Sequence, residues 1–156
     1  MSTTGNFFGQ QKDKSRVKTL IVADFFKAYF PIINYSVGKD AREIIYLDLF
    51  CGPGKFDDGE PSTPLSLLDV VNGFKSDDIR NKLRIVFNDE NSEYISKLET
   101  LVSEHEVRSK LKYDPIITNK RAGEVDIKVL TYKNAQYFHL LILGDIRMSP
   151  PNRHVS

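Results

Sequence analysis

The stretch YLDLFCGPGKFDDGEPSTPL, from Tyr46 to Leu65, contains the pattern that decides the fold. Its first residues belong to the run Ile44–Phe50, which is apolar almost throughout, as expected for a parallel strand covered on both faces. The run leads into Gly52 and Gly54, which are separated by one residue, and then into an acidic loop. A strand that passes through Gly-x-Gly into a helix is typical of a turn that binds a cofactor. Gly52 is expected to permit the tight turn, and Gly54 to let the backbone approach the ligand closely.

Helices and strands are expected to alternate along the rest of the chain. A long apolar helix is predicted from Lys14 to Phe30, where Pro31 should end it. A second helix is predicted from an N-cap at Ser62. Later strands are expected at LRIVFNDEN, DPIITNKR and YFHLLILGDI, with helices at SEYISKLETLVSEHEV and GEVDIKVLTYKNAQ. This order predicts an α/β domain, with a parallel sheet between two helical layers and Ile44–Phe50 at its centre.

The first helix is expected to be heavily buried. Its main buried face is predicted to consist of Val17, Leu20, Ile21, Phe25, Ala28 and Tyr29, widened by Val22, Phe26 and Phe30. Residues 1–13 are expected to form a flexible tail, followed by one domain over residues 14–156, in which residues 14–43 form the leading helix and loop.

Composition excludes several classes of protein. The chain has 156 residues, 22 Lys and Arg, 21 Asp and Glu, and a net charge of +1, so charge gives no argument for nucleic acid or an anionic membrane. A single cysteine excludes an internal disulfide and fits a reducing compartment. The sequence has no signal-peptide pattern and no apolar run of membrane-spanning length, so we expect a cytoplasmic protein without a membrane segment.

Two phosphate-binding interpretations of the glycine turn are disfavoured. A P-loop requires a glycine five residues before the Gly-Lys pair and Ser or Thr after it, where this chain has Leu49 and Phe56. The third glycine of a dinucleotide fingerprint is replaced by Asp57. The carboxylates of the acidic loop would also repel a pyrophosphate.

S-adenosylmethionine (SAM) fits the turn better because it carries no phosphate. Backbone amides near Gly52 could bind its carboxylate, Asp48 its ammonium, and Phe50 could lie near its sulfonium. Asp89, after the second strand, is the candidate for the ribose diol, and Glu90 is a less favoured one. The alternative is that Asp89 caps the following helix.

The segments YLDLFCGPG and NDEN resemble motifs of the class I SAM-dependent methyltransferases. The longer segments VKTLIVADFFKAYFPIIN and IVFNDENSEYISKL resemble the three-Cys-motif partner family, prokaryotic proteins associated in genomes with a radical-SAM-like protein that carries three cysteines. The residues that match its turn and helix start are Asp48, Phe50, Gly52, Pro53, Gly54, Gly59, Thr63, Pro64 and Leu65. The resemblance implies a Rossmann-like methyltransferase fold, SAM as cofactor, and the three-cysteine protein as a partner.

The resemblance covers residues 14–138, and about four of the seven strands usual in this class can be assigned. The family's Asp-Pro-aromatic-Gly segment is replaced by LLILGDIRMSPPNRHVS. One choice of synonymous codons for Leu141–Arg147 encodes Asp-Pro-Trp-Gly-Tyr in another frame. A truncated or frameshifted gene is therefore expected, with a suspect tail at residues 141–156 and an inactive, poorly folded product.

Two other functions stay open: a non-catalytic partner of the three-cysteine protein, and a fragment of a nucleic-acid methyltransferase. Cys51 lies inside the turn, so it does not suit the nucleophile of cytosine methylation. The segment Ser149–Asn152 lacks the aromatic residue that would stack on a flipped base. The histidines are too scattered for a metal site, and the sequence identifies no catalytic base or methyl acceptor.

Overall fold

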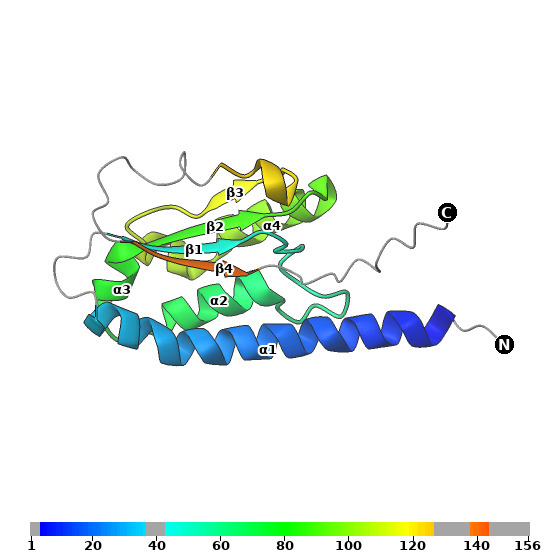
Figure 1. Ribbon diagram of the computed structural model, residues 1–156, viewed down its shortest axis with the longest axis horizontal. Helices are drawn as coiled ribbons and strands as arrows, with labels where there is room; N and C mark the ends of the chain where they lie inside the picture. The colour runs from blue at the N-terminus through cyan, green and yellow to red at the C-terminus, as the bar shows by residue number, and fades with distance from the viewer. Residues whose placement is uncertain (1–3, 37–42, 127–137, 144–156) are drawn as a thin grey trace, which may run out of the picture.

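The computed structural model describes residues 4–36, 43–126 and 138–143 (Figure 1). Its helices are α1 (Thr4–Ser36), α2 (Thr63–Asn72), α3 (Asp77–Lys82) and α4 (Ser92–Glu104), with 3-10 turns η1 (Glu106–Lys110) and η2 (Ala122–Glu124). Its strands are β1 (Glu43–Asp48), β2 (Leu83–Asn88), β3 (Ile116–Thr118) and β4 (Phe138–Leu143). None of the helices in these ranges has the length and apolar character needed to span a bilayer.

The strands form one parallel sheet in the order β3-β2-β1-β4. In β1, Tyr46 lies between Ile85 of β2 and Leu141 of β4. All six residues of β1 are buried, as predicted for the central strand. The predicted α/β class with a parallel sheet is confirmed.

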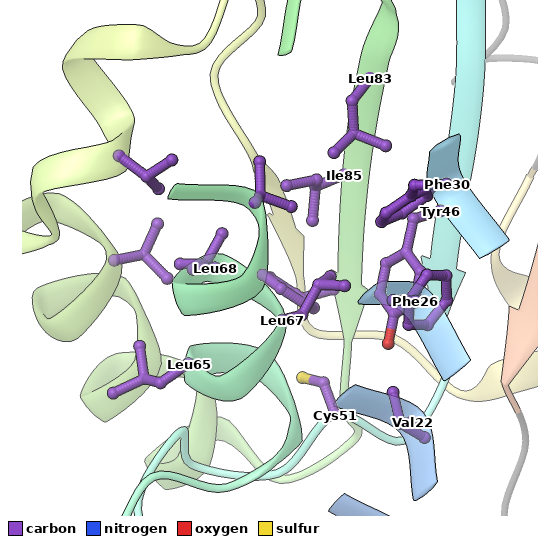
Figure 2. Packing of buried hydrophobic residues seen from close by; sticks show 14 of the residues in the cluster. Val22, Phe26, Phe30, Tyr46, Cys51, Leu65, Leu67, Leu68, Leu83 and Ile85 are labelled. Atoms are coloured by element: carbon purple, nitrogen blue, oxygen red, sulfur yellow. The ribbon is translucent and has the colours of Figure 1, made fainter. Parts of the chain in front are cut away.

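Helices α1, α2 and α4 contribute to one core cluster on the face of the sheet that carries Tyr46 and Ile85. Figure 2 shows Phe26 and Phe30 of α1 beside Tyr46, with Leu67 of α2 on the side of Phe26. The ring centroids of Phe26 and Tyr46 are 4.9 Å apart in an edge-on arrangement, which is favourable for aromatic pairs. Right-handed crossovers from β1 to β2 and from β2 to β3 place their helices on the same face of a sheet.

The opposite face of the sheet carries Ile45, Leu47 and Val86, which are also buried. Beside them, the carboxylate of Glu43 and the guanidinium of Arg84 form an ion pair at 2.9 Å. Both faces of the central strands are therefore shielded from water. The helix predicted from Gly123 to Gln136 lies mostly outside the described residues. At its predicted start the structure has the short 3-10 turn η2.

Helix α1 is longer than predicted at both ends. It begins at Thr4, so the segment expected to be a loose tail up to residue 13 is largely helical, and it continues through Pro31 to Ser36. The prediction that Pro31 ends the helix was wrong. Ile33, one turn after the buried Phe30, is only 4% exposed. Its packing in the core explains why the helix continues, because packing can outweigh a proline cost of about 3 kcal/mol.

The buried face of α1 also differs from the prediction. Val22, Phe26 and Phe30, expected to widen the buried face, form its centre together with Ile33. The residues expected at the centre of that face are exposed instead: Val17, Leu20, Ile21 and Phe25. Both sides of the helix are apolar, so periodicity alone could not determine which side faces the sheet.

Helix α2 follows the prediction closely. Leu65, Leu68 and Val71 are buried, and Ser62 occupies the N-cap position, although its side chain makes no capping hydrogen bond. Helix α4 also matches, since Ile95 and Leu98 face the core.

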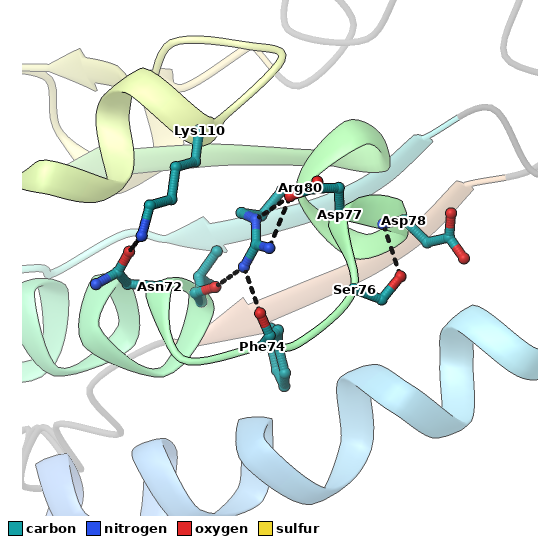
Figure 3. Close-up of polar contacts among 8 residues, drawn as sticks. Asn72, Phe74, Ser76, Asp77, Asp78, Arg80 and Lys110 are labelled. Atoms are coloured by element: carbon teal, nitrogen blue, oxygen red, sulfur yellow. Dashed lines mark hydrogen bonds and ion pairs between the residues drawn. The ribbon is translucent and has the colours of Figure 1, made fainter.

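Helix α3 was not predicted, and a buried arginine joins it to the end of α2 (Figure 3). Arg80 is 5% exposed and donates hydrogen bonds to the carbonyls of Val71 at 3.0 Å and Phe74 at 2.8 Å. It also donates to the Asp77 carboxylate at 2.7 Å, and the Ser76 hydroxyl accepts from the N–H of Asp78 at 3.1 Å. These bonds fix the connection that leads from α2 into β2.

Candidate functional site

Asp48 ends β1 and orients the turn that follows. Its carboxylate accepts a hydrogen bond from the N–H of Phe50 at 3.1 Å and one from the Tyr46 hydroxyl at 3.4 Å. Asp48 is fully buried, and this burial raises its pKa, an effect partly offset by the positive charge of Lys18 on α1. Because of the burial, direct contact between Asp48 and a ligand would require the turn to move.

The two glycines of the turn differ in their surroundings, although both have positive φ, 74° at Gly52 and 89° at Gly54. A Cβ at Gly52 would meet no atom within 4 Å. A Cβ at Gly54 would lie 2.9 Å from Leu98 Cδ1 and 3.1 Å from Leu101 Cδ1. We expected Gly54 to let a ligand approach the backbone, but its bare Cα faces the leucines of α4. Gly52 is the glycine with open space beside it.

The structure brings Asp89 and Gly52 together from the ends of β2 and β1. One carboxylate oxygen of Asp89 accepts from the N–H of Gly52 at 3.0 Å, and the other accepts from the N–H of Asn91 at 2.9 Å. Asn91 is the N-cap of α4, with its side chain accepting from Glu93 at 3.0 Å and Tyr94 at 3.3 Å. The alternative prediction that Asp89 caps this helix is therefore wrong.

Asn88 joins the ends of three strands and was missed by the sequence analysis. Its fully buried amide group donates to the carbonyls of Leu49 at 3.1 Å and Lys120 at 2.9 Å. Its side-chain oxygen accepts from the Thr118 hydroxyl at 2.8 Å and the Lys120 N–H at 3.1 Å. The sequence offered one signal for this role, a polar Asn at the end of the strand segment LRIVFN, because a buried amide needs hydrogen-bond partners.

Helix α1 lies against the acidic loop. Arg16 forms an ion pair with Asp58, and its guanidinium lies over the ring of Phe56 at 5.0 Å. The hydrogen bond from Arg16 holds the pKa of Asp58 below its ordinary value. Nearby, the hydroxyls of Thr19 and Thr63 are 3.1 Å apart and buried. Part of the acidic charge is thus neutralised by α1, a contact that no sequence pattern indicated.

The remaining predicted residues lie around the same turn. Phe50 is 37% exposed, Pro53 is half-buried, and Glu90 is exposed next to Asp89. Cys51 is buried, and this burial raises the pKa of its thiol, so it is poorly suited to act as a nucleophile. Within the described ranges, no three His, Cys, Asp or Glu side chains gather in a way that could hold a metal ion.

In comparisons with known proteins, no family model matches this chain and no curated protein matches it. The resemblance to the three-Cys-motif partner family stays a prediction from the quoted motifs.

Proposed function

We propose that this chain binds SAM at the turn after β1, as a methyltransferase-like protein of the three-Cys-motif partner type. The hydrogen bond between the Asp89 carboxylate and the Gly52 N–H is the observation that carries the proposal. It joins, from two strand ends, two of the residues assigned to SAM on chemical grounds. Ligands of open parallel sheets bind at this carboxyl edge.

Asp89 fits the role of ribose ligand. Each of its carboxylate oxygens accepts one backbone N–H, while a carboxylate oxygen has two lone pairs. A lone pair on each oxygen is left for the two hydroxyls of a ribose. The bonds to Gly52 and Asn91 hold the carboxylate in place, so little conformational entropy is lost when a diol binds.

The methionine end of SAM needs a different assignment from the one expected. The N–H of Gly52 is already bonded to Asp89, so it is a weaker candidate for the SAM carboxylate. Lys18 lies on α1 between Arg16 and Thr19, which contact the acidic loop and the start of α2. Its charge acts on Asp48, and we assign the SAM carboxylate to this cation. Asp48 would stabilise the ammonium by its negative charge. Bound SAM would supply an electrophilic methyl group, and the residues named here bind and orient it.

Calorimetric titration of the chain with SAM tests the proposal. Asp89→Ala should weaken binding by about 1.5 to 3 kcal/mol, the usual range for hydrogen bonds to a charged group. Asp114→Ala is the matched control, since Asp114 is exposed and pairs with Arg108 at 3.3 Å away from the turn. Absence of SAM binding, or equal affinity of the Asp89 variant and the native chain, would refute the proposal.

A second pair of variants tests the methionine end. Lys18→Ala should weaken SAM binding because it removes the cation assigned to the carboxylate. Lys97→Ala, an exposed lysine on α4, should leave the affinity unchanged. If the two variants bind SAM equally well, the assignment of Lys18 is wrong, while the assignment of Asp89 stands on its own result.

A further inference from the structure

Helix α1 carries a second apolar stripe on the side away from the core. We call it the outer stripe: Val17, Ile21, Phe25, Ala28, Ile32 and Tyr35. Its large members are strongly exposed, from 45% at Phe25 to 90% at Tyr35. Figure 1 shows α1 running along the outside of the molecule. Exposed apolar patches of this kind mark interaction surfaces.

We propose that the outer stripe is a homodimer interface, in which α1 packs antiparallel against α1 of a second copy with the two-fold axis beside Phe25. A two-fold interface requires a patch that is complementary to itself. The spacing and charges of this stripe meet that requirement.

The spacing lets side chains of the two copies interdigitate. In an antiparallel pair, residues equally distant from the axis on opposite sides lie at the same level. Phe25 then lies beside Phe25 of the second copy, and the small side chain of Ala28 leaves room for the ring. Ile21 falls between Ala28 and Ile32 of the second copy, and Val17 falls between Ile32 and Tyr35. Such alternation is the basis of close packing between helices.

The charges beside the stripe favour the antiparallel direction. Asp24 and Lys27 are exposed and lie on the same flank of the stripe. With the axis beside Phe25, Asp24 of each copy falls one residue, about 1.5 Å along the helix, from the level of Lys27 of the other, which lets two symmetric pairs of opposite charge form. In a parallel pair in register this flank would face the opposite flank of the second copy, so Asp24 and Lys27 would not meet. These pairs of opposite charge therefore form only in the antiparallel arrangement.

The first experiment measures the mass of the full chain by sedimentation at increasing concentration. We expect a dimer for the native chain and a monomer for Phe25→Glu, which buries a charge at the axis. Tyr94→Glu is the control, because Tyr94 is an exposed aromatic residue on α4. A native chain that stays monomeric, or a Phe25→Glu variant that stays dimeric, overturns the proposal. Circular dichroism checks that each variant is folded.

A charge swap tests the register. Asp24→Lys or Lys27→Asp alone should weaken dimerisation roughly tenfold, since each change creates two repulsive pairs in place of attractive ones. The double variant restores both pairs and should recover the native dissociation constant. Failure of the double variant to recover it contradicts the antiparallel register.

Cysteine cross-linking tests the axis. Phe25→Cys should form an intermolecular disulfide on mild oxidation, because the two positions meet at the axis. Tyr35→Cys should not, since at 1.5 Å per residue the two copies of this position lie about 30 Å apart along the helices. The native thiol of Cys51 is buried and should not interfere. Equal cross-linking at both positions would exclude the proposed axis.

Discussion

Gly54 and Gly59 have the same backbone conformation, with φ of 89° and 87°, but different surroundings. Gly54→Ala should destabilise the fold by about 2 to 4 kcal/mol, because a left-handed alanine costs about 1 kcal/mol and contact with Leu98 adds an overpacking cost. Gly59→Ala has no atom within 4 Å of its new Cβ and should cost only about 1 kcal/mol from the backbone. Urea unfolding measures both, and equal losses would contradict the packing role of Gly54.

Asp48 should make stability depend on pH in a direction unusual for an aspartate. Burial raises its pKa in the folded chain, so between its ordinary and its raised pKa the folded state binds more protons than the unfolded state. The free energy of unfolding contributed by Asp48 therefore falls as pH rises through this window. Asp48→Asn keeps an acceptor for the Phe50 N–H and removes the ionisation.

Urea unfolding at several pH values compares the native chain with Asp48→Asn, so that contributions from other acids cancel. The variant should gain stability relative to the native chain as pH rises. The same variant should bind SAM more weakly, because the neutral amide no longer stabilises an ammonium. A constant stability difference across the pH range would show that Asp48 has the same pKa in both states.

The role of a single residue could be predicted from the sequence where it depends on neighbouring positions in the chain. The glycine turn and Asp89 were identified because a strand end, a Gly-x-Gly turn and an acid after the next strand are local patterns. Asn88 and Lys18 were not assigned, since their partners come from other strands or from another helix.

Among the helices, α3 is joined to the end of α2 by the buried side chain of Arg80. Arg80→Ala should lower the free energy of unfolding by about 2 to 4 kcal/mol, because it removes charged hydrogen bonds to two carbonyls at the end of α2. Arg108→Ala is the matched control: its side chain is 47% exposed and pairs with Asp114, so its loss should cost less than about 1 kcal/mol. Similar losses in the two variants would refute the capping role of Arg80.

Helices and strands could be predicted where the pattern of apolar residues fits only one buried face. Strand β1 and helices α2 and α4 follow their patterns, because each has one clear apolar face or is buried on all sides. Helix α1 has two apolar sides, and the prediction chose the exposed one. Its passage through Pro31 depends on the burial of Ile33, a tertiary contact that a local proline rule does not include.

For the whole molecule, hydrogen exchange should be slowest in β1. This strand pairs on both sides and all its residues are buried, whereas β3 has three half-buried residues and pairs with β2 at the edge of the described sheet. Opening of β1 requires disruption of the core, so its amides should exchange by global unfolding. Mass spectrometry of the exchanged chain tests this, and faster exchange in β1 than in β3 would contradict it.

Because Cys51 is buried in the turn, the rate at which its thiol reacts can be used to measure opening of the turn. Its thiol lies beside Gly52, and its N–H is held by the Asn88 carbonyl at 3.0 Å. A thiol reagent can therefore react only while the turn is open, and the labelling rate measures how often it opens. We expect labelling much slower than that of a free thiol, and slower still with SAM if the turn holds it. Rapid labelling would mean that the turn opens readily in the folded chain.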